Sequence, residues 1–234
     1  MKLSVQIESE QFLELPLKER KFAKTRIRIL QVFLSELENK PFEIIKIKDI
    51  AKQADVSEPT FYNYFPEKED MVLFFIQIWS LSVSVFAFGM NSKKNKEISG
   101  YSLISAIFRY TAKESKKNSR ILLEIISLQA RSKKELQIPK LTLAERYLLF
   151  PKIKDIENFP AGGVEDLIEK GLRDAIKSKE LREESNINAL GVAIGSLFFG
   201  VPILCSQLKL NLETMWLESL QLLWVGAGGK TAKH

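Results

Sequence analysis

The 234-residue sequence contains one cysteine and one histidine, which excludes several classes of chemistry. Cys205 lies in an apolar run, and His234 is the last residue. One cysteine cannot form a disulfide within the chain, which fits a reducing cytoplasm. The chain also lacks the ligands of a Cys/His metal site and the base of a histidine-dependent triad. We therefore expect no metal, no cofactor and no enzymatic activity, and a buried, inert Cys205.

Alternation of apolar and polar residues at the period of a β-strand is scarce, so we expect an all-α fold. The predicted divisions are a flexible arm (1–17), a three-helix domain (18–66), a larger helical domain (67–225) and a flexible tail (226–234). The predicted helices are 18–38, a helix pair within 47–65, a linking helix over 67–90, and 98–114, 119–132, 139–150, 164–177, 187–208 and 212–225.

Two runs, Met71–Ser92 and Ser185–Leu208, contain no charged residue. Each is long enough to span a bilayer, so a membrane-associated protein is an alternative interpretation. Both runs contain several polar side chains, and the second contains Pro202. We expect no signal sequence, because residues 1–17 have no continuous apolar core. These features favour helices buried in a protein core.

Positive charge is concentrated locally. The net charge of the whole chain is +6, yet residues 1–70 hold 12 Lys and Arg against 13 Asp and Glu. The segment 18–28, however, contains six basic residues and one acidic residue. A local basic patch of this kind is what contacts to nucleic-acid phosphates require.

The segment 47–65 has the pattern of a helix-turn-helix. Its first helix presents one apolar face at i, i+3, i+4 and i+7, formed by Ile47, Ile50, Ala51 and Ala54. Asp55 stands at the turn, where Asp tolerates the left-handed conformation. Ser57 is a good N-cap for the second helix, because its oxygen can accept a backbone N–H.

The second helix of this pair has distinct inner and outer residues. Phe61 and Phe65, four apart, are predicted to anchor it inward. The outward residues are then polar or aromatic: Thr60, Tyr62, Asn63 and Tyr64. Hydroxyls and amides on a helix in the major groove can bond base edges and phosphates. The alternative is a plain helical hairpin that binds no DNA.

Residues 25–75 resemble the DNA-binding region of the tetracycline-repressor (TetR) family of bacterial transcriptional regulators. The resemblance rests on Thr25-Arg26-Ile27-Arg28-Ile29-Leu30, Asp49-Ile50-Ala51, Ala54-Asp55-Val56-Ser57, Pro59-Thr60-Phe61-Tyr62-Asn63-Tyr64-Phe65 and Pro66-Glu67-Lys68-Glu69-Asp70-Met71. The sequence departs from the family pattern at Asp55, which replaces a glycine, at Ile45-Lys46, and at Glu58.

The resemblance implies which residues meet double-stranded DNA. The implied base and groove contacts come from the second helix, and the implied phosphate contacts include flanking cations. The predicted set is Arg26, Lys48, Ser57, Pro59, Thr60, Tyr62, Asn63, Tyr64 and Lys68.

The resemblance also implies that residues 18–66 are the DNA-binding domain and residues 67–225 the regulatory and dimerisation domain, with a small-molecule pocket. It further implies a repressor that its ligand releases from a palindromic operator. Apolar and aromatic density fits such a pocket, although the same residues could be ordinary core. Arg109 and Glu124 could meet a polar ligand group, each other, or solvent. The predicted ligand-binding residues are Phe75, Trp79, Phe108, Arg109 and Glu124.

Tight, specific binding to a palindromic DNA site requires a two-fold dimer. We expect the last two apolar helices to form the dimer interface. The predicted interface is Gly191, Gly195, Leu197, Phe198, Leu212, Trp216 and Leu220. Besides a membrane-associated protein, a small-molecule binder or enzyme with a vestigial helix-turn-helix remains an alternative function.

Overall fold

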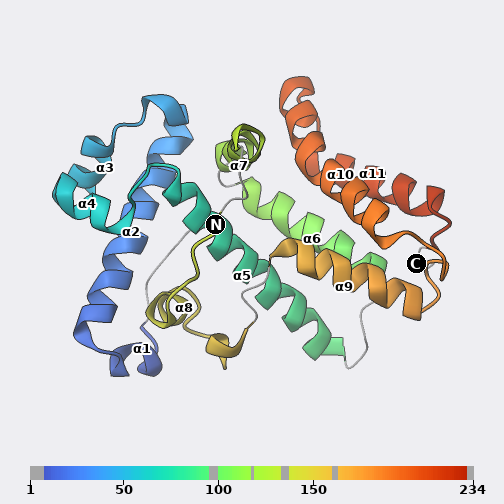
Figure 1. Cartoon of the computed structure of the whole chain (residues 1–234), viewed down its shortest axis with the longest axis horizontal. Coiled ribbons are helices and arrows are strands. Elements are labelled where there is room, and N and C mark those ends of the chain that lie inside the picture. The colour runs from blue at the N-terminus through green and yellow to red at the C-terminus, as the bar shows by residue number, and fades with distance from the viewer. Residues whose placement is uncertain (1–7, 95–99, 117–118, 133–136, 160–162, 231–234) are drawn as a thin grey trace. The chain divides into compact units, whose positions relative to one another are not determined.

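The computed structural model describes residues 8–94, 100–116, 119–132, 137–159 and 163–230 (Figure 1). Within these ranges all regular elements are helical, which confirms the predicted all-α fold. The elements are α1 (Glu10–Glu14), α2 (Leu17–Asn39), η1 (Phe42–Ile44), α3 (Ile47–Gln53), α4 (Glu58–Tyr64), α5 (Asp70–Lys94), α6 (Gly100–Ser115), α7 (Ser119–Arg131), α8 (Leu143–Leu149), η2 (Ile156–Asn158), α9 (Val164–Lys177), α10 (Ile187–Leu208) and α11 (Leu212–Gly226).

The chain folds into two compact units. The first contains Met1–Trp79 and Lys117–Ala161, and the second contains Ser80–Lys116 and Gly162–His234. The predicted boundary near residue 66 therefore differs from the structure. Helices α7 and α8, expected in the regulatory domain, belong to the same unit as the helix-turn-helix, and α5 is shared by both units.

The first unit is built around α2, whose apolar stripe packs against α3, α7 and α8. Ile27, Leu30 and Phe33 on that stripe are fully buried. Because they recur every three residues, they stay on one side of the helix.

Residues 8–17 are ordered in this unit, so the predicted flexible arm is wrong for them. Ser9 caps α1 by accepting a hydrogen bond from the Phe12 backbone N–H at 3.2 Å. Phe12 is fully buried, and α1 packs against α8. An isolated five-residue helix is unstable in water, so burial of Phe12 is what holds α1 in place. Residues 1–7 lie outside the described part of the chain.

In the second unit, α6 and α9 meet through two glycines. A Cβ added to Gly100 would lie 2.1 Å from the Gly171 carbonyl oxygen and 2.6 Å from the Ala175 Cβ. The two backbones can approach this closely only because position 100 has no side chain. Helix α9 has the bounds that its amphipathic pattern predicted, 164–177.

An aromatic cluster joins α6, α10 and α11. The Phe108 ring centroid lies 5.5 Å from that of Phe198 and 5.2 Å from that of Trp216. The Trp216 indole N–H donates to the Leu197 carbonyl at 3.0 Å. Phe198, Trp216 and Leu220 are buried within the protomer. They were predicted to lie in a dimer interface, but in this structure their side chains belong to the core of the protomer.

The outer face of α10 and α11 is apolar and open. Val192 is 72% exposed and Leu222 is 76% exposed. A Cβ at Gly191 or Gly195 would meet nothing within 4 Å. Leu197 and Leu212 are half-buried. These four predicted interface residues thus remain accessible, and the face continues over Ile203, Leu204, Leu208 and Val225.

Two helices are long and apolar enough to cross a membrane, over Asp70–Gly89 and Ile187–Leu208. In the apolar window of the first helix 72% of the residues are buried, as expected for a core helix, against 22% in that of the second. More of the apolar surface of α10 than of α5 is therefore left uncovered in this structure.

The predicted flexible tail is wrong for residues 226–230. The Lys230 backbone N–H donates to the Glu180 carbonyl at 2.8 Å. The Trp224 indole N–H donates to the Lys230 carbonyl at 3.3 Å. These bonds hold the chain end beyond α11 against the second unit. Residues 231–234 lie outside the described ranges.

We predict that Gly100→Ala lowers the free energy of unfolding by about 1–3 kcal/mol, because the added methyl collides with the backbone of α9. The control is Gly89→Ala in α5, where a Cβ meets nothing within 4 Å. That change should be neutral or stabilising by about 0.5–1 kcal/mol. Urea denaturation followed by circular dichroism measures both. Equal stabilities would contradict the close approach of α6 and α9.

Candidate DNA interface

Helices α3 and α4 form a helix-turn-helix around a tight corner. Asp55 adopts a left-handed conformation with φ of 59°, as predicted for the turn. The Val56 N–H donates to the Ala51 carbonyl at 3.0 Å, which closes the corner. Ala51 and Ala54 are buried at the crossing, so larger side chains there would push the two helices apart.

The start of α4 is fixed by a cap. Ser57 Oγ accepts a hydrogen bond from the Thr60 N–H at 3.2 Å, and the two hydroxyls lie 2.8 Å apart. Pro59 lies in the first turn, where a missing N–H has no cost. Ser57 and Pro59 are exposed. The first turn of α4 is therefore both rigid and accessible.

The two faces of α4 differ as predicted. Phe61 and Phe65 are fully buried. Tyr62 is 47% exposed, and Asn63 is also exposed. Tyr64 is half-buried, with its ring centroid 4.8 Å from that of Phe22 in α2. The outward surface of α4 thus presents Tyr62 and Asn63, whereas Tyr64 lies at its edge.

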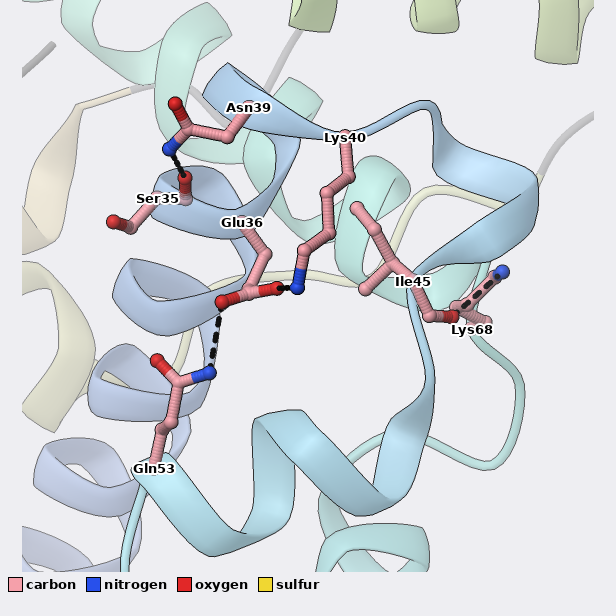
Figure 2. A network of polar contacts seen from close by, with 7 residues as sticks. All are labelled: Ser35, Glu36, Asn39, Lys40, Ile45, Gln53 and Lys68. Atoms are coloured by element: carbon pink, nitrogen blue, oxygen red, sulfur yellow. Dashed lines mark hydrogen bonds and ion pairs between the residues drawn. The ribbon is translucent and has the colours of Figure 1, made fainter.

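Lys68 does not point away from the domain, in contrast to the predicted phosphate contact. Its ammonium donates to the carbonyls of Phe42 at 2.7 Å and Ile45 at 3.2 Å, and it lies 3.4 Å from the Glu43 carbonyl oxygen (Figure 2 shows the bond to Ile45). It also lies 4.2 Å from the centroid of the Phe42 ring. An ammonium has three donors, and these carbonyls use them. Lys68 therefore joins the start of α5 to the η1 segment.

Arg26 is also turned inward rather than toward a phosphate. Its Nη1 forms an ion pair with Glu145 at 3.1 Å, and its side chain is 12% exposed. The guanidinium carbon lies 4.1 Å from the Phe74 ring centroid and 5.2 Å from that of Phe65. Sequence reasoning missed Glu145, which lies 119 residues away along the chain. Lys48, by contrast, is exposed on α3 as expected.

A polar network fixes α3 on α2 (Figure 2). The Glu36 carboxylate accepts a hydrogen bond from the Gln53 side chain at 2.8 Å and pairs with Lys40. The bond from Gln53, assisted by Lys40, lowers the pKa of Glu36. A carboxylate with a lowered pKa stabilises the fold above its ordinary titration range, and this stabilisation is lost as the pH falls through the folded pKa. No local pattern in the sequence indicated this network.

Residues 29–73 match the bacterial regulatory proteins of the tetR family. These residues therefore form a TetR-family DNA-binding domain. A 47-residue segment is 45% identical to the HTH-type transcriptional regulator EthR of Mycobacterium tuberculosis. It covers 20% of this chain and spans about a fifth, 22%, of the length of EthR.

Solved TetR-family structures share the fold of most of the chain. One is Thermus thermophilus FadR, a transcriptional repressor in complex with lauroyl-CoA, with a TM-score of 0.62 at 20% identity. This similarity covers 89% of this chain and 98% of that one. Another is Bacillus subtilis FadR in complex with stearoyl-CoA, with a TM-score of 0.58 at 16% identity over 88% and 99% of the two chains.

The predicted ligand-binding residues are divided between the two compact units. Phe75, Trp79 and Glu124 belong to the first, and Phe108 and Arg109 to the second. Phe75 and Phe108 are buried, whereas Arg109 is exposed. The Glu124 carboxylate pairs with Arg131 at 2.8 Å. Burial raises the pKa of Glu124, and the charge of Arg131 opposes that shift. Among the described residues, no cluster of His, Cys, Asp or Glu could hold a metal ion.

We predict that Lys68→Ala destabilises the TetR-family domain by about 2 kcal/mol, because carbonyls of the η1 segment lose their donor. The matched control is Lys48→Ala, which should change the stability by less than about 0.5 kcal/mol. Thermal unfolding followed by circular dichroism compares the two. If Lys68→Ala unfolds like the unmodified protein, the ammonium is not a structural donor and its assignment to phosphate is restored.

Proposed function

We propose that this protein is a sequence-specific DNA-binding transcriptional regulator that inserts α4 into the major groove. The observation that carries the proposal is the two-faced recognition helix: Phe61 and Phe65 are buried while Tyr62 and Asn63 face outward. The major groove is about 12 Å wide and admits one α-helix. A phenol and an amide can bond both base edges and phosphate oxygens. Since DNA is the proposed partner, we expect the protein in the cytoplasm.

Exposed cations around the helix-turn-helix support this proposal. Lys46, Lys48 and Lys52 are exposed on or beside α3, and Lys18 and Lys21 are exposed on α2. Attraction between lysines and the phosphate backbone supplies most of the sequence-independent affinity for DNA. We propose these five lysines as phosphate contacts instead of Arg26 and Lys68, whose charged groups are bound by partners within the domain.

We further propose a two-fold homodimer formed through the outer face of α10 and α11. Large contiguous apolar patches exposed on a monomer mark interaction surfaces. Gly191 and Gly195 leave room for a second backbone to approach. A two-fold dimer presents two copies of α4, which matches a palindromic operator.

A small-molecule effector that releases the protein from its operator completes the proposal. Support comes from the family and from structural neighbours whose descriptions include lauroyl-CoA, stearoyl-CoA and resorcinol. A ligand can cause release only if it binds the DNA-incompetent conformation more tightly than the competent one. Thermal-shift screening with lauroyl-CoA among the probes, followed by DNA-release assays on each hit, tests this part. If no probe both binds the protein and weakens its binding to DNA, the proposed effector is contradicted.

Pull-down of host genomic DNA with the purified protein, followed by sequencing, tests DNA binding and identifies the operator. We predict that Tyr62→Phe then weakens operator binding by about five- to tenfold, because one hydroxyl contact to base or phosphate is lost. Tyr101→Phe in α6, which belongs to the second unit, is the control and should bind as the unmodified protein does. Fluorescence anisotropy titration measures both variants. Equal affinity of the Tyr62 variant would remove Tyr62 from the interface.

We predict that Leu222→Glu converts the dimer to a monomer, since it places a charge in an apolar interface. The control is Leu13→Glu in α1, a leucine that is 50% exposed but distant in sequence from α11. Size-exclusion chromatography with light scattering reports the mass of each variant. A dimeric Leu222 variant would place the interface elsewhere.

A further inference from the structure

The guanidinium of Arg26 lies where three helices of the first unit meet. It comes from α2, and its two nearest rings are Phe65, which ends α4, and Phe74 in α5. The Phe65 N–H donates to the Phe61 carbonyl at 3.0 Å, so the ring of Phe65 is tied to the last turn of α4. The guanidinium contacts both rings, which also meet edge to face with their centroids 5.7 Å apart, and these contacts determine where the end of α4 lies.

One carboxylate holds this cation. Glu145 Oε1 accepts from Arg26 Nη1, and Glu145 itself is fully buried. Among the described residues, Arg26 Nε has no hydrogen-bond partner. The ion pair with Glu145 is therefore the polar contact that orients the guanidinium, and the rings supply the remaining contacts.

Glu145 cannot follow Arg26 if the arginine shifts. Its second oxygen accepts a hydrogen bond from the Thr142 N–H at 2.7 Å, and the Thr142 hydroxyl accepts from the Glu145 N–H at 3.2 Å. This capping box fixes the carboxylate to the first turn of α8. The next residue, Arg146, donates to the carbonyls of Ile156 at 3.1 Å and Phe159 at 2.9 Å, which fixes α8 to the following segment.

We propose that Arg26 and Glu145 are positioning residues for DNA recognition: α8, through Glu145, sets the orientation of Arg26 and thereby of the recognition helix. The inference rests on the proposed function. It assigns a role in DNA binding to α8, which lies about 70 residues beyond the segment that matches the TetR family. Neither residue touches DNA in this account.

The charge of Glu145 allows this role to be separated from a general electrostatic one. Glu145→Gln removes a negative charge, so long-range attraction to DNA alone would leave binding equal or tighter. If Glu145 instead positions the recognition helix, Glu145→Gln should weaken DNA binding. Arg26→Lys keeps the positive charge, but an ammonium lacks the planar fork with which a guanidinium contacts the two rings and pairs with the carboxylate at the same time. Both variants should therefore weaken specific binding.

The test compares operator DNA with scrambled DNA of equal length, at a temperature where circular dichroism shows each variant to be folded. We expect Glu145→Gln and Arg26→Lys to bind the operator at least about tenfold more weakly and scrambled DNA with unchanged affinity. The control, Glu14→Gln on the exposed surface of α1, should bind both DNAs as the unmodified protein does. Operator affinities equal to that of the control would overturn the proposal.

A measurement on the free protein keeps this inference separate from the proposed function. Amide hydrogen exchange should accelerate in α4 of both variants and stay unchanged in α9, which belongs to the other unit. If the unmodified protein binds no DNA, the proposed function fails, yet faster exchange in α4 would still support positioning by Arg26 and Glu145. Unchanged exchange in α4 would overturn positioning even if the unmodified protein binds its operator.

Discussion

The burial of Phe61 and Phe65 fixes which side of α4 faces water, and each proposal about DNA depends on that orientation. Because these two residues lie four apart, their burial leaves the intervening Tyr62 and Asn63 on the outside. The cap at Ser57 and the left-handed Asp55 then set where the helix begins. A helix of seven residues has little stability of its own, so its surroundings determine both its existence and its direction.

The first unit uses two of its cations for its own architecture. Arg26 contacts the rings of Phe65 and Phe74 and is paired with a buried carboxylate, and Lys68 donates to carbonyls of the η1 segment. Isolated charges are costly to bury, and both residues avoid that cost through specific partners. Lys68 connects the segment that follows α4 to η1, and Arg26 connects α2 to α8 and to the end of α4. Two cations of the kind that bind phosphates thus hold together the unit whose surface is proposed to contact DNA.

Local periodicity was sufficient to predict most helices. The bounds of 164–177 and 187–208 agree with the structure, because amphipathic spacing and capping residues are properties of neighbouring positions. Long-range partners could not be predicted in this way. Nothing near Arg26 indicates Glu145, and nothing near residue 12 shows that α1 packs against α8. In α10 and α11 apolar residues lie on both the inner and the outer side, so spacing alone could not separate Phe198 and Trp216, which face inward, from Val192 and Leu222, which face out.

The inward position of Lys68 has a consequence for how salt would act on a DNA complex. Each phosphate that a protein neutralises releases condensed counterions and contributes about 0.9 to the slope of log affinity against log salt concentration. Two cations engaged inside the domain release none. A complex of this protein with an operator would therefore tolerate rising ionic strength better than the lysines and arginines of its first 70 residues suggest, and hydroxyl and amide contacts would carry a larger share of its affinity.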